Sequence, residues 1–481
     1  MATTSIVGLT AAQADGEPPT LRQLTERLDR EQPLIMGEYG VPGAAVAVVR
    51  QGEAVWSTGY GDAAAGEPMT ADTVFQVASI SKTLTAWGVM RLVESGQVSL
   101  EAPIADYVTR WSLPPSDHDA SGVTVARVMS HTAGFNRVDG HPLPVGEQLP
   151  TLEESLSGDN GGGQSLRIEF EPGRGFHYSN AGYTLLQLMI EEVTGERFSD
   201  YMQAAILDPL GMTDSTYDPT RVTAQATGHY ASGQPLPHYR LTEQAAGGLY
   251  STANDLALLV AASMAGPAGE PVGRGVLTSE SVRTMMAPQQ MPDGSVVSLG
   301  HLNDQLDDGF TTTGNNGHNI GWITNMVIVP ELGEGIVILT NSDVETTGLG
   351  LRAWTQWLGV SDTFTTQASM VALDETSTIM LVGAGLLLAL AGALLVVALV
   401  QALVGRRRRR WLWRSRHPAP RIAIRGSLAA LAIAGLIAVL VLPERPVYET
   451  LLPIETAAVL VAVVCSAAAA LVFASTRRAH R

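Results

Sequence analysis

The chain has 481 residues, 45% of them hydrophobic, which is enough for two or three domain-sized units with well-filled cores. Its net charge of −17 is unevenly distributed, because residues 379–481 carry 13 Arg and 3 Glu whereas residues 1–378 carry a net charge of −27. The acidic first part argues against nucleic-acid binding. The single cysteine, Cys465, excludes an intrachain disulfide framework and any site with several cysteine ligands.

Residues 1–20 lack the basic start and the apolar core of an export signal, although Ala12-Gln13-Ala14 resembles a signal cleavage site. We interpret this segment as the remnant of an export signal whose apolar part lies outside the given sequence. The alternative interpretation is that the following domain is not exported and that the membrane topology inferred below is inverted.

Residues 21–365 predict one soluble domain. Its predicted elements are, in chain order, a helix at 21–39, strands at 44–50 and 54–60, a mostly helical stretch at 80–285, strands at 324–330 and 336–341, and a helix at 346–358. Strands from both ends of the domain therefore bracket a helical insertion. This order predicts an α/β (α+β) fold in which helices flank an antiparallel sheet, beside an all-helical lobe.

Lys82 is the only lysine in the chain, and the other 29 cationic side chains are all arginine. Arginine cannot be deprotonated in a protein, whereas a lysine amine loses its proton where burial and neighbours favour the neutral form. Lys82 follows Ser79 by three residues, and residues at this spacing lie on one face of a helical turn. The pair indicates a base beside a nucleophile, because a serine hydroxyl needs a neighbour to take its proton. The alternative is an ordinary surface lysine with a serine nearby by chance.

The end of the chain has the pattern of a membrane region. Three apolar runs occur there, at 379–404, 426–442 and 456–474. The loop 405–425 between the first two carries nine arginines, and three more arginines follow the third run. Because positively charged loops stay in the cytoplasm, we expect three transmembrane helices with this loop and the C-terminus cytoplasmic. Residues 366–378 are then a linker, and the large domain is extracytoplasmic.

Four motifs of the soluble domain occur in a fixed order: FQVASISK at 75–82, VARVMSHTAGF at 125–135, EPGRGFHYSNAGYTLL at 171–186 and AGGLYSTANDL at 246–256. Together they resemble the class C β-lactamase-like, penicillin-recognising serine hydrolases. That family includes β-lactamases, D-alanyl-D-alanine carboxypeptidases, D-amino-acid amidases and esterases. The resemblance covers about residues 20–360, and it implies the serine β-lactamase-like fold and an acyl-enzyme mechanism on an amide or ester, without cofactor or metal.

The resemblance also implies roles for individual residues. Ser79 is the acylating nucleophile, Lys82 its proton partner and Tyr178 a second proton carrier, so that the group shares a mobile proton. Asn180, two residues after Tyr178, binds the substrate. His131, although its residue type suits catalysis, is interpreted as a structural residue of the turn that begins there.

The family's third motif, usually Lys-Thr-Gly or His-x-Gly on the strand facing the serine, differs in this chain. Alignment back from Gly321-Trp322 places Asn315-Asn316-Gly317 there, so that an amide replaces the usual cation or imidazole. An amide donates hydrogen bonds but carries no charge, so we expect weak recognition of a substrate carboxylate. The open alternative is a shifted alignment with His318 in that place. In both cases the backbone N–H groups of Ser79 and His318 form the expected oxyanion hole.

The leading prediction is a membrane-anchored, extracytoplasmic serine hydrolase acting on a cell-wall D-peptide, a β-lactam or another small amide or ester. The alternative is a catalytically weak ligand-binding or sensor protein with the same fold, for which the short cytoplasmic loop offers little signalling output. A transporter is disfavoured because the apolar runs contain almost no polar residues. These motifs do not specify the substrate, the acyl acceptor (water or an amine), the oligomeric state or any protein partner.

Overall fold

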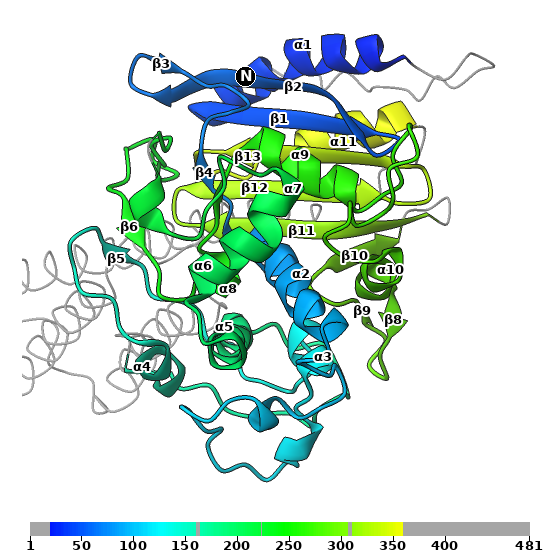
Figure 1. The fold of residues 1–481 in the computed structure, drawn as a ribbon. Helices are drawn as coiled ribbons and strands as arrows, with labels where there is room; N and C mark the ends of the chain where they lie inside the picture. The colour runs from blue at the N-terminus through cyan, green and yellow to red at the C-terminus, as the bar shows by residue number, and fades with distance from the viewer. Residues whose placement is uncertain (1–19, 160–163, 223, 306–309, 359–481) are drawn as a thin grey trace, which may run out of the picture. The chain divides into compact units, whose positions relative to one another are not determined.

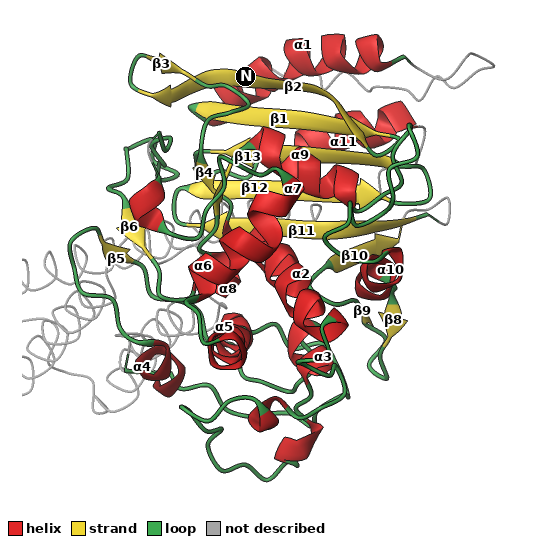
Figure 2. Ribbon diagram, viewed as in Figure 1, coloured by secondary structure: helices red, strands yellow, loops and turns green. Residues whose placement is uncertain are grey.

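The computed structural model describes residues 20–159, 164–222, 224–305 and 310–358 (Figure 1). A seven-stranded antiparallel sheet carries helices on both faces, and a region of helices and loops adjoins it (Figure 2). The predicted N-terminal segment, the linker and the three apolar runs lie outside the described residues. In the part that is described, no helix is long and apolar enough to cross a membrane.

The sheet is built from strands near the two ends of the described chain. Its order is β10-β11-β12-β13-β1-β2-β3. The bounds are Gly43–Arg50 for β1, Glu53–Ala64 for β2, Glu67–Pro68 for β3, Leu302–Gln305 for β10, Thr311–Asn319 for β11, Trp322–Val329 for β12 and Glu334–Thr340 for β13. Both predicted hairpins are confirmed, and β1 joins them by pairing with β13 from Ala44 opposite Thr340 to Arg50 opposite Glu334.

Strand β1 contributes to two cores, because successive side chains of a strand point to opposite faces of the sheet. Val46 and Val48 pack in one core with α1 (Leu21–Tyr39) and α11 (Thr347–Leu358). Ala45 and Ala47 belong to the other core, on the face covered by α9 (Ala253–Ala262) (Figure 1). Burial on both faces explains why this strand reads as a continuous apolar run. The two helices predicted at the ends of the domain are confirmed as α1 and α11.

The second region is less helical than the sequence predicts, and the predicted all-helical lobe is wrong. Its helices are α2 (Ser81–Glu94), α3 (Val125–Met129), α4 (Leu152–Ser157), α5 (Asn180–Thr194), α6 (Phe198–Met202), α7 (Asp208–Leu210), α8 (Gln244–Gly247) and α10 (Ser279–Met286). Short strands pair as β4–β7 (Phe75–Gln76 with Tyr250–Ser251), β5–β6 (Leu143–Pro144 with Tyr239–Arg240) and β8–β9 (Gln289–Gln290 with Val296–Val297). The physical reason is proline, which is strongly disfavoured in a helix interior, at positions 103, 114, 115, 142, 144 and 150.

Helix α2 is the centre of the molecule. It runs from β11, the strand next to the edge strand β10, past α5 and α10 (Figure 1), and it contacts β11, α5 and α10. Leu84, Trp87 and Val89 are completely buried around it, so the helix is enclosed on all sides rather than amphipathic. A helix held in this way gives the residues at its first turn a fixed position.

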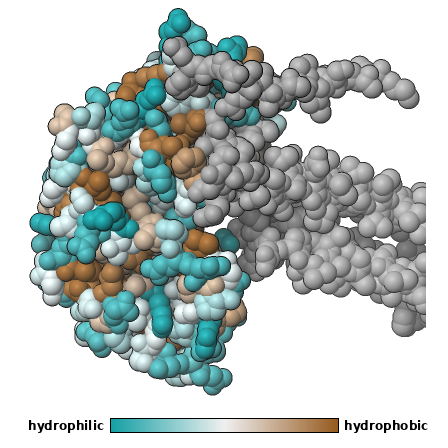
Figure 3. All heavy atoms as spheres, turned by 90° about the vertical axis from the view of Figure 1, so that its right-hand side faces the viewer, coloured by the Kyte–Doolittle hydropathy of each residue, from teal (hydrophilic) through white to brown (hydrophobic). Residues whose placement is uncertain are grey.

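Among the described residues, the exposed large apolar side chains are two on α1, Leu34 and Tyr39, and five elsewhere: Val145, Phe170, Leu258, Val296 and Ile320. Figure 3 shows one face of the molecule, on which hydrophilic residues surround smaller hydrophobic patches. Isolated apolar residues of this kind are normal on a protein surface and by themselves indicate no partner.

Asp255, the third residue of α9, supplies a test of the fold through pH. It is buried and accepts hydrogen bonds from Ser215 Oγ at 2.7 Å and from the Asp214 N–H at 2.9 Å. Burial outweighs these bonds and raises the pKa of Asp255 to about 6. An aspartate in the unfolded chain titrates near pH ~4, so between these values the folded state binds more protons and acidification stabilises it.

Asp255→Asn removes this titration. We therefore expect the Tm of the wild type to rise relative to that of the variant as the pH falls from about 7 to about 5. Thermal melts of both proteins at several pH values in this range measure the difference. A difference that does not change with pH would contradict the raised pKa.

Candidate active site

Ser79 lies in the short 3₁₀ helix η1 (Ala78–Ile80), directly before α2 and in contact with β11 of the sheet. The preceding residue, Val77, is held from both sides, since its N–H donates to Leu249 O at 3.0 Å and its carbonyl accepts from Thr324 Oγ1 at 2.9 Å. Ala78 has a φ of +49°, which is rare for a residue other than glycine. Strain of this kind persists only where the surroundings enforce it, and it is common at functional sites.

The turn at Ala78–Ile80 is also held by hydrogen bonds of Ser81. Its hydroxyl donates to Ala78 O at 2.6 Å and accepts from the Leu249 N–H at 3.0 Å. The Ser81 carbonyl accepts from the Tyr217 hydroxyl at 2.9 Å. The second serine of the SISK motif therefore shapes the turn, while the first one is left to present its hydroxyl.

Lys82 is 1% exposed, and its Nζ lies between two oxygens. It donates to Ser79 Oγ at 2.9 Å and to Ala246 O at 2.6 Å. Burial lowers the pKa of Lys82, and the neighbouring Tyr178 opposes this shift without cancelling it. A buried amine with a lowered pKa can exist in the neutral form that accepts a proton.

Tyr178 completes the group from a segment 99 residues further along the chain. Its hydroxyl lies 2.8 Å from Ser79 Oγ, and Lys82 Nζ lies 5.0 Å from the centre of its ring. Ser79 Oγ thus has an amine on one side and a phenol on the other. The structure brings together the three residues for which the sequence predicts a catalytic role.

Asn180, the first residue of α5, has a partner that the sequence does not indicate. Its Nδ2 donates to Asp139 Oδ1 at 2.7 Å, and Asp139 also forms an ion pair with Arg137 at 3.2 Å. The charge of Asp139 raises the pKa of Lys82 and that of Arg137 lowers it, so this pair lies within electrostatic reach of the buried amine. The substrate-binding role of Asn180 stays a prediction.

Strand β11 approaches the serine turn at Gly317. Pairing with β10 ends at Gly314, and beyond that residue β11 packs against η1. A Cβ on Gly317 would lie 2.5 Å from Val77 O and 2.9 Å from Ala78 Cβ, so only glycine fits here. This close approach brings the backbone after Gly317, where the sequence predicts the His318 oxyanion donor, alongside the turn that carries Ser79.

The side chains of the third motif point in different directions. Asn315 is 6% exposed, and its Nδ2 donates to Gly300 O at 3.3 Å and to Thr83 Oγ1 at 3.5 Å. The His318 side chain is 55% exposed, and its Nε2 lies 3.5 Å from Asp343 Oδ1. The hydrogen bonds of Asn315 run to α2 and to the loop at Gly300 rather than to Ser79, and its role in recognising the substrate stays a prediction.

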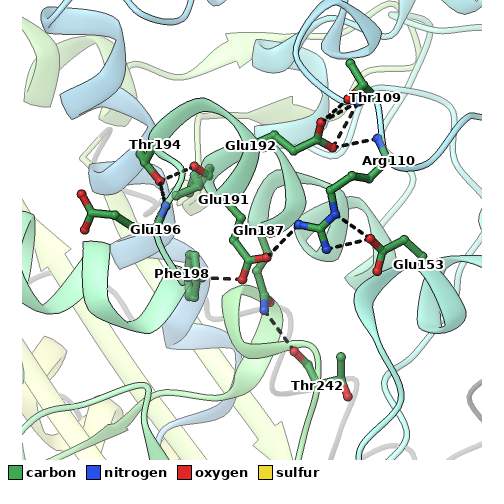
Figure 4. A network of polar contacts seen from close by, with 11 residues as sticks. Thr109, Arg110, Glu153, Gln187, Glu191, Glu192, Thr194, Glu196, Phe198 and Thr242 are labelled. Atoms are coloured by element: carbon green, nitrogen blue, oxygen red, sulfur yellow. Dashed lines mark hydrogen bonds and ion pairs between the residues drawn. The ribbon is translucent and has the colours of Figure 1, made fainter.

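The carbonyl that holds Lys82 is itself positioned by Gln187 of α5. Gln187 Oε1 accepts from the Ala245 N–H at 3.0 Å, and its Nε2 donates to Thr242 O at 3.2 Å (Figure 4). The side chain is 3% exposed, so this pair of bonds is shielded from water. Sequence reasoning missed both Gln187 and Ala246, because a backbone acceptor leaves no signature in residue type.

The other end of α5 is fixed by ionic contacts. Arg110 forms ion pairs with Glu153 at 2.6 Å and with Glu191 at 3.4 Å, and the Thr109 N–H donates to Glu192 at 2.9 Å (Figure 4). Such pairs contribute little to stability individually when they are partly exposed. As a network they fix α5 against α4 and against the loop at residues 109–110.

The fold and this group of residues define a serine hydrolase of the β-lactamase, D-alanine carboxypeptidase and esterase type. A family model described as Beta-lactamase matches residues 21–360. The chain belongs to this family. Among the described residues, no group of three or more His, Cys, Asp or Glu side chains could hold a metal ion.

Curated relatives carry names from several activities. Penicillin-binding protein 4* of Bacillus subtilis is 32% identical over 187 residues, which are 37% of this chain and 38% of that protein. Esterase EstB of Burkholderia gladioli is 29% identical over 243 residues, which are 48% of this chain and 61% of that protein. The chain therefore covers less than two thirds of the length of these two relatives. Penicillin-binding protein 4 of Amycolatopsis lactamdurans is 27% identical over 327 residues, which are 64% of this chain and 83% of that protein.

Solved structures confirm the fold. The octameric penicillin-binding protein homologue of Pyrococcus abyssi has a TM-score of 0.58 and 25% identity, covering 70% of this chain and 77% of that one. A D-amino acid amidase of Ochrobactrum anthropi has a TM-score of 0.56 and 23% identity, covering 70% of this chain and 99% of that one. At this identity the second similarity concerns the fold alone.

Proposed function

We propose that this chain is a membrane-anchored extracytoplasmic hydrolase that forms an acyl-enzyme at Ser79 on a small amide or ester. The observation that carries the proposal is the environment of the only lysine. Lys82 is buried, its pKa is lowered, and its amine donates to the same hydroxyl oxygen that lies 2.8 Å from Tyr178. An amine placed this way suits removal of the serine proton better than a structural role.

In the proposed reaction, one of the two groups Lys82 and Tyr178 has already lost its proton before the substrate binds. The Ser79 proton passes to the neutral amine of Lys82 or to an ionised Tyr178, while the Ser79 oxygen attacks the substrate carbonyl carbon. The N–H groups of Ser79 and His318 stabilise the oxyanion. The proton then goes to the departing amine or alcohol as its bond to the carbonyl breaks. Water or an amine releases the acyl group in a second cycle of the same steps.

The proposed substrate class is an amide or ester without a carboxylate on the leaving group. β11 contains no lysine or arginine, and at the usual position of the third-motif cation it carries Asn315. The exposed side chain beside it, His318, is already paired with Asp343, whose carboxylate is mostly buried. A leaving-group carboxylate would therefore find no lysine or arginine on β11 and would lie near the negative charge of Asp343. The name of one relative, an esterase, is compatible with neutral substrates.

The membrane location is proposed from the sequence. The apolar runs at 379–404, 426–442 and 456–474 supply the anchor, and the arginines of the loop 405–425 orient it with the enzyme domain outside the cytoplasm. A serine hydrolase of this family on the outer side of the membrane would have access to cell-wall peptides and to esters and amides from the surroundings.

The first test compares substitutions of Ser79, the proposed nucleophile, and Lys82, the proposed base. We expect Ser79→Ala to abolish labelling by a fluorophosphonate, and Lys82→Arg to label about 10²- to 10⁴-fold more slowly than wild type, as slowly as Lys82→Ala. Arginine keeps the charge but cannot accept a proton. Thermal melting checks that each variant is folded, and Ser95→Ala at the far end of α2 is the matched control that keeps labelling. Lys82→Arg labelling within a few-fold of wild type would remove the basis of the proposal.

The second test concerns Asn315. The enzyme should hydrolyse a neutral D-alanyl ester or amide faster than the same acyl donor with a free carboxylate on its leaving group. Asn315→Lys should raise the carboxylate-to-neutral ratio of kcat/KM by about ten- to a hundredfold, since a charge-assisted hydrogen bond is worth roughly 1.5–3 kcal/mol. An unchanged ratio in a well-folded variant means that Asn315 only fastens β11 to Gly300, and His318 becomes the next candidate.

The third test concerns topology. Protease added to intact cells should degrade the domain at residues 21–365 and spare the arginine-rich loop 405–425, as followed with antibodies to a tag placed in each part. The protease is expected to cut the loop only after the cells are permeabilised. Protection of the large domain in intact cells would show that the orientation is inverted.

A further inference from the structure

His131 has no role in the proposed reaction, yet it lies directly against one of the catalytic side chains. Its ring packs on the ring of Tyr178, with centres 4.3 Å apart and planes tilted by 30°. The side chain is 8% exposed, so this face of Tyr178 is closed to water by the imidazole. A tyrosine held on one face has little freedom to rotate its hydroxyl away from Ser79.

Two hydrogen bonds join His131 to the residues on either side of Tyr178. The Ser179 N–H donates to His131 Nδ1 at 3.2 Å, and the His177 N–H donates to His131 O at 2.7 Å. The φ of His131 is +57°, so the backbone is held in a rare conformation while the residue makes both bonds. Both the backbone and the ring of Tyr178 are therefore positioned by a single residue.

The imidazole must be neutral to make these contacts. A protonated ring carries hydrogen on Nδ1 and cannot accept from Ser179. Burial, and after it the charge of Lys82, hold the pKa of His131 well below its usual value. The charged and titratable groups beside the ring are Lys82 of α2 and Tyr178 and Tyr183 of the α5 segment. Burial therefore keeps His131 a neutral acceptor, and the charge of protonated Lys82 adds to this effect.

We infer that His131 is a positioning residue for Tyr178: its neutral ring and its acceptor nitrogen hold the phenol hydroxyl at hydrogen-bond distance from Ser79. The inference rests on the proposed function, because it assigns Tyr178 a part in moving the Ser79 proton. It replaces the purely structural interpretation of His131 as a turn residue. A displacement of the phenol of about 1 Å is enough to lower the rate of such a step by roughly a hundredfold.

The test is a double-mutant cycle with the full chain and a fluorophosphonate as the probe, in which the limiting labelling rate and the reversible inhibition constant are measured separately. We expect His131→Leu to lower the limiting rate by about ten- to a hundredfold and to leave the inhibition constant within about threefold, because it misplaces Tyr178 without touching the probe. In the Tyr178→Phe background the same substitution should cause no further loss. Equal losses in both backgrounds, or His131→Leu labelling at the wild-type rate, overturn the inference.

His131→Asn keeps the test valid if the leucine variant is poorly folded. Asparagine tolerates the left-handed backbone conformation and offers an oxygen that can accept from the Ser179 N–H. We expect this variant to label faster than His131→Leu, though more slowly than wild type because the ring is lost. An asparagine variant that is folded and no faster than the leucine variant overturns the role assigned to the hydrogen bond.

A matched control is available in His301, a second buried histidine whose pKa is lowered to about 4 and whose Nδ1 lies 2.8 Å from Leu299 O. His301→Leu should lower Tm without changing the limiting labelling rate. If it slows labelling as much as His131→Leu does, loss of any buried histidine is sufficient and the inference fails. Failure of the proposed function gives a different result, since Ser79→Ala would then still be labelled.

Discussion

The structure depends on the burial of one amine. Taking the Lys82 ammonium out of water costs several kcal/mol unless hydrogen bonds replace its hydration. Here Ser79 Oγ and Ala246 O accept from it, and the rings of Tyr178 and Tyr183 lie 5.0 and 5.5 Å away. Burial lowers the pKa of Lys82, and the neighbouring Tyr178 offsets part of this shift. Stability and reactivity are therefore set by one arrangement, and the neighbouring elements are arranged to maintain it.

Those elements come from distant parts of the chain. The pairing of β1 with β13 closes the sheet between its two ends, and β11 then packs against the turn that carries Ser79. Gly317 permits this approach because a side chain there would collide with the backbone of Val77. On the other side, Gln187 of α5 holds the segment that contains Ala246. The site exists only where the sheet and the helical region are both in place.

Membership of the family and the geometry of Ser79, Lys82 and Tyr178 favour the proposed enzyme over a passive binding domain. The proposed preference for neutral substrates rests on β11, which contains no lysine or arginine and whose His318 Nε2 lies 3.5 Å from Asp343 Oδ1. In the proposed function, nucleophile activation depends on α2 and on the segment before α5, and the third-motif contribution to substrate choice depends on β11.

Features that depend on neighbouring residues were predictable from the amino-acid sequence. Helical periodicity at 21–39, the strand runs on either side of Gln51-Gly52 and the three-residue spacing of Ser79 and Lys82 are local patterns, and the structure confirms each. Irregular stretches of the second region were missed, because a general helical tendency conceals the effect of separate prolines. The tertiary structure alone decided the Ala246 acceptor, the Asp139 partner of Asn180 and the packing of His131 on Tyr178. The reason is physical: a backbone carbonyl has no residue identity, and contacts between distant segments depend on packing that no local pattern records.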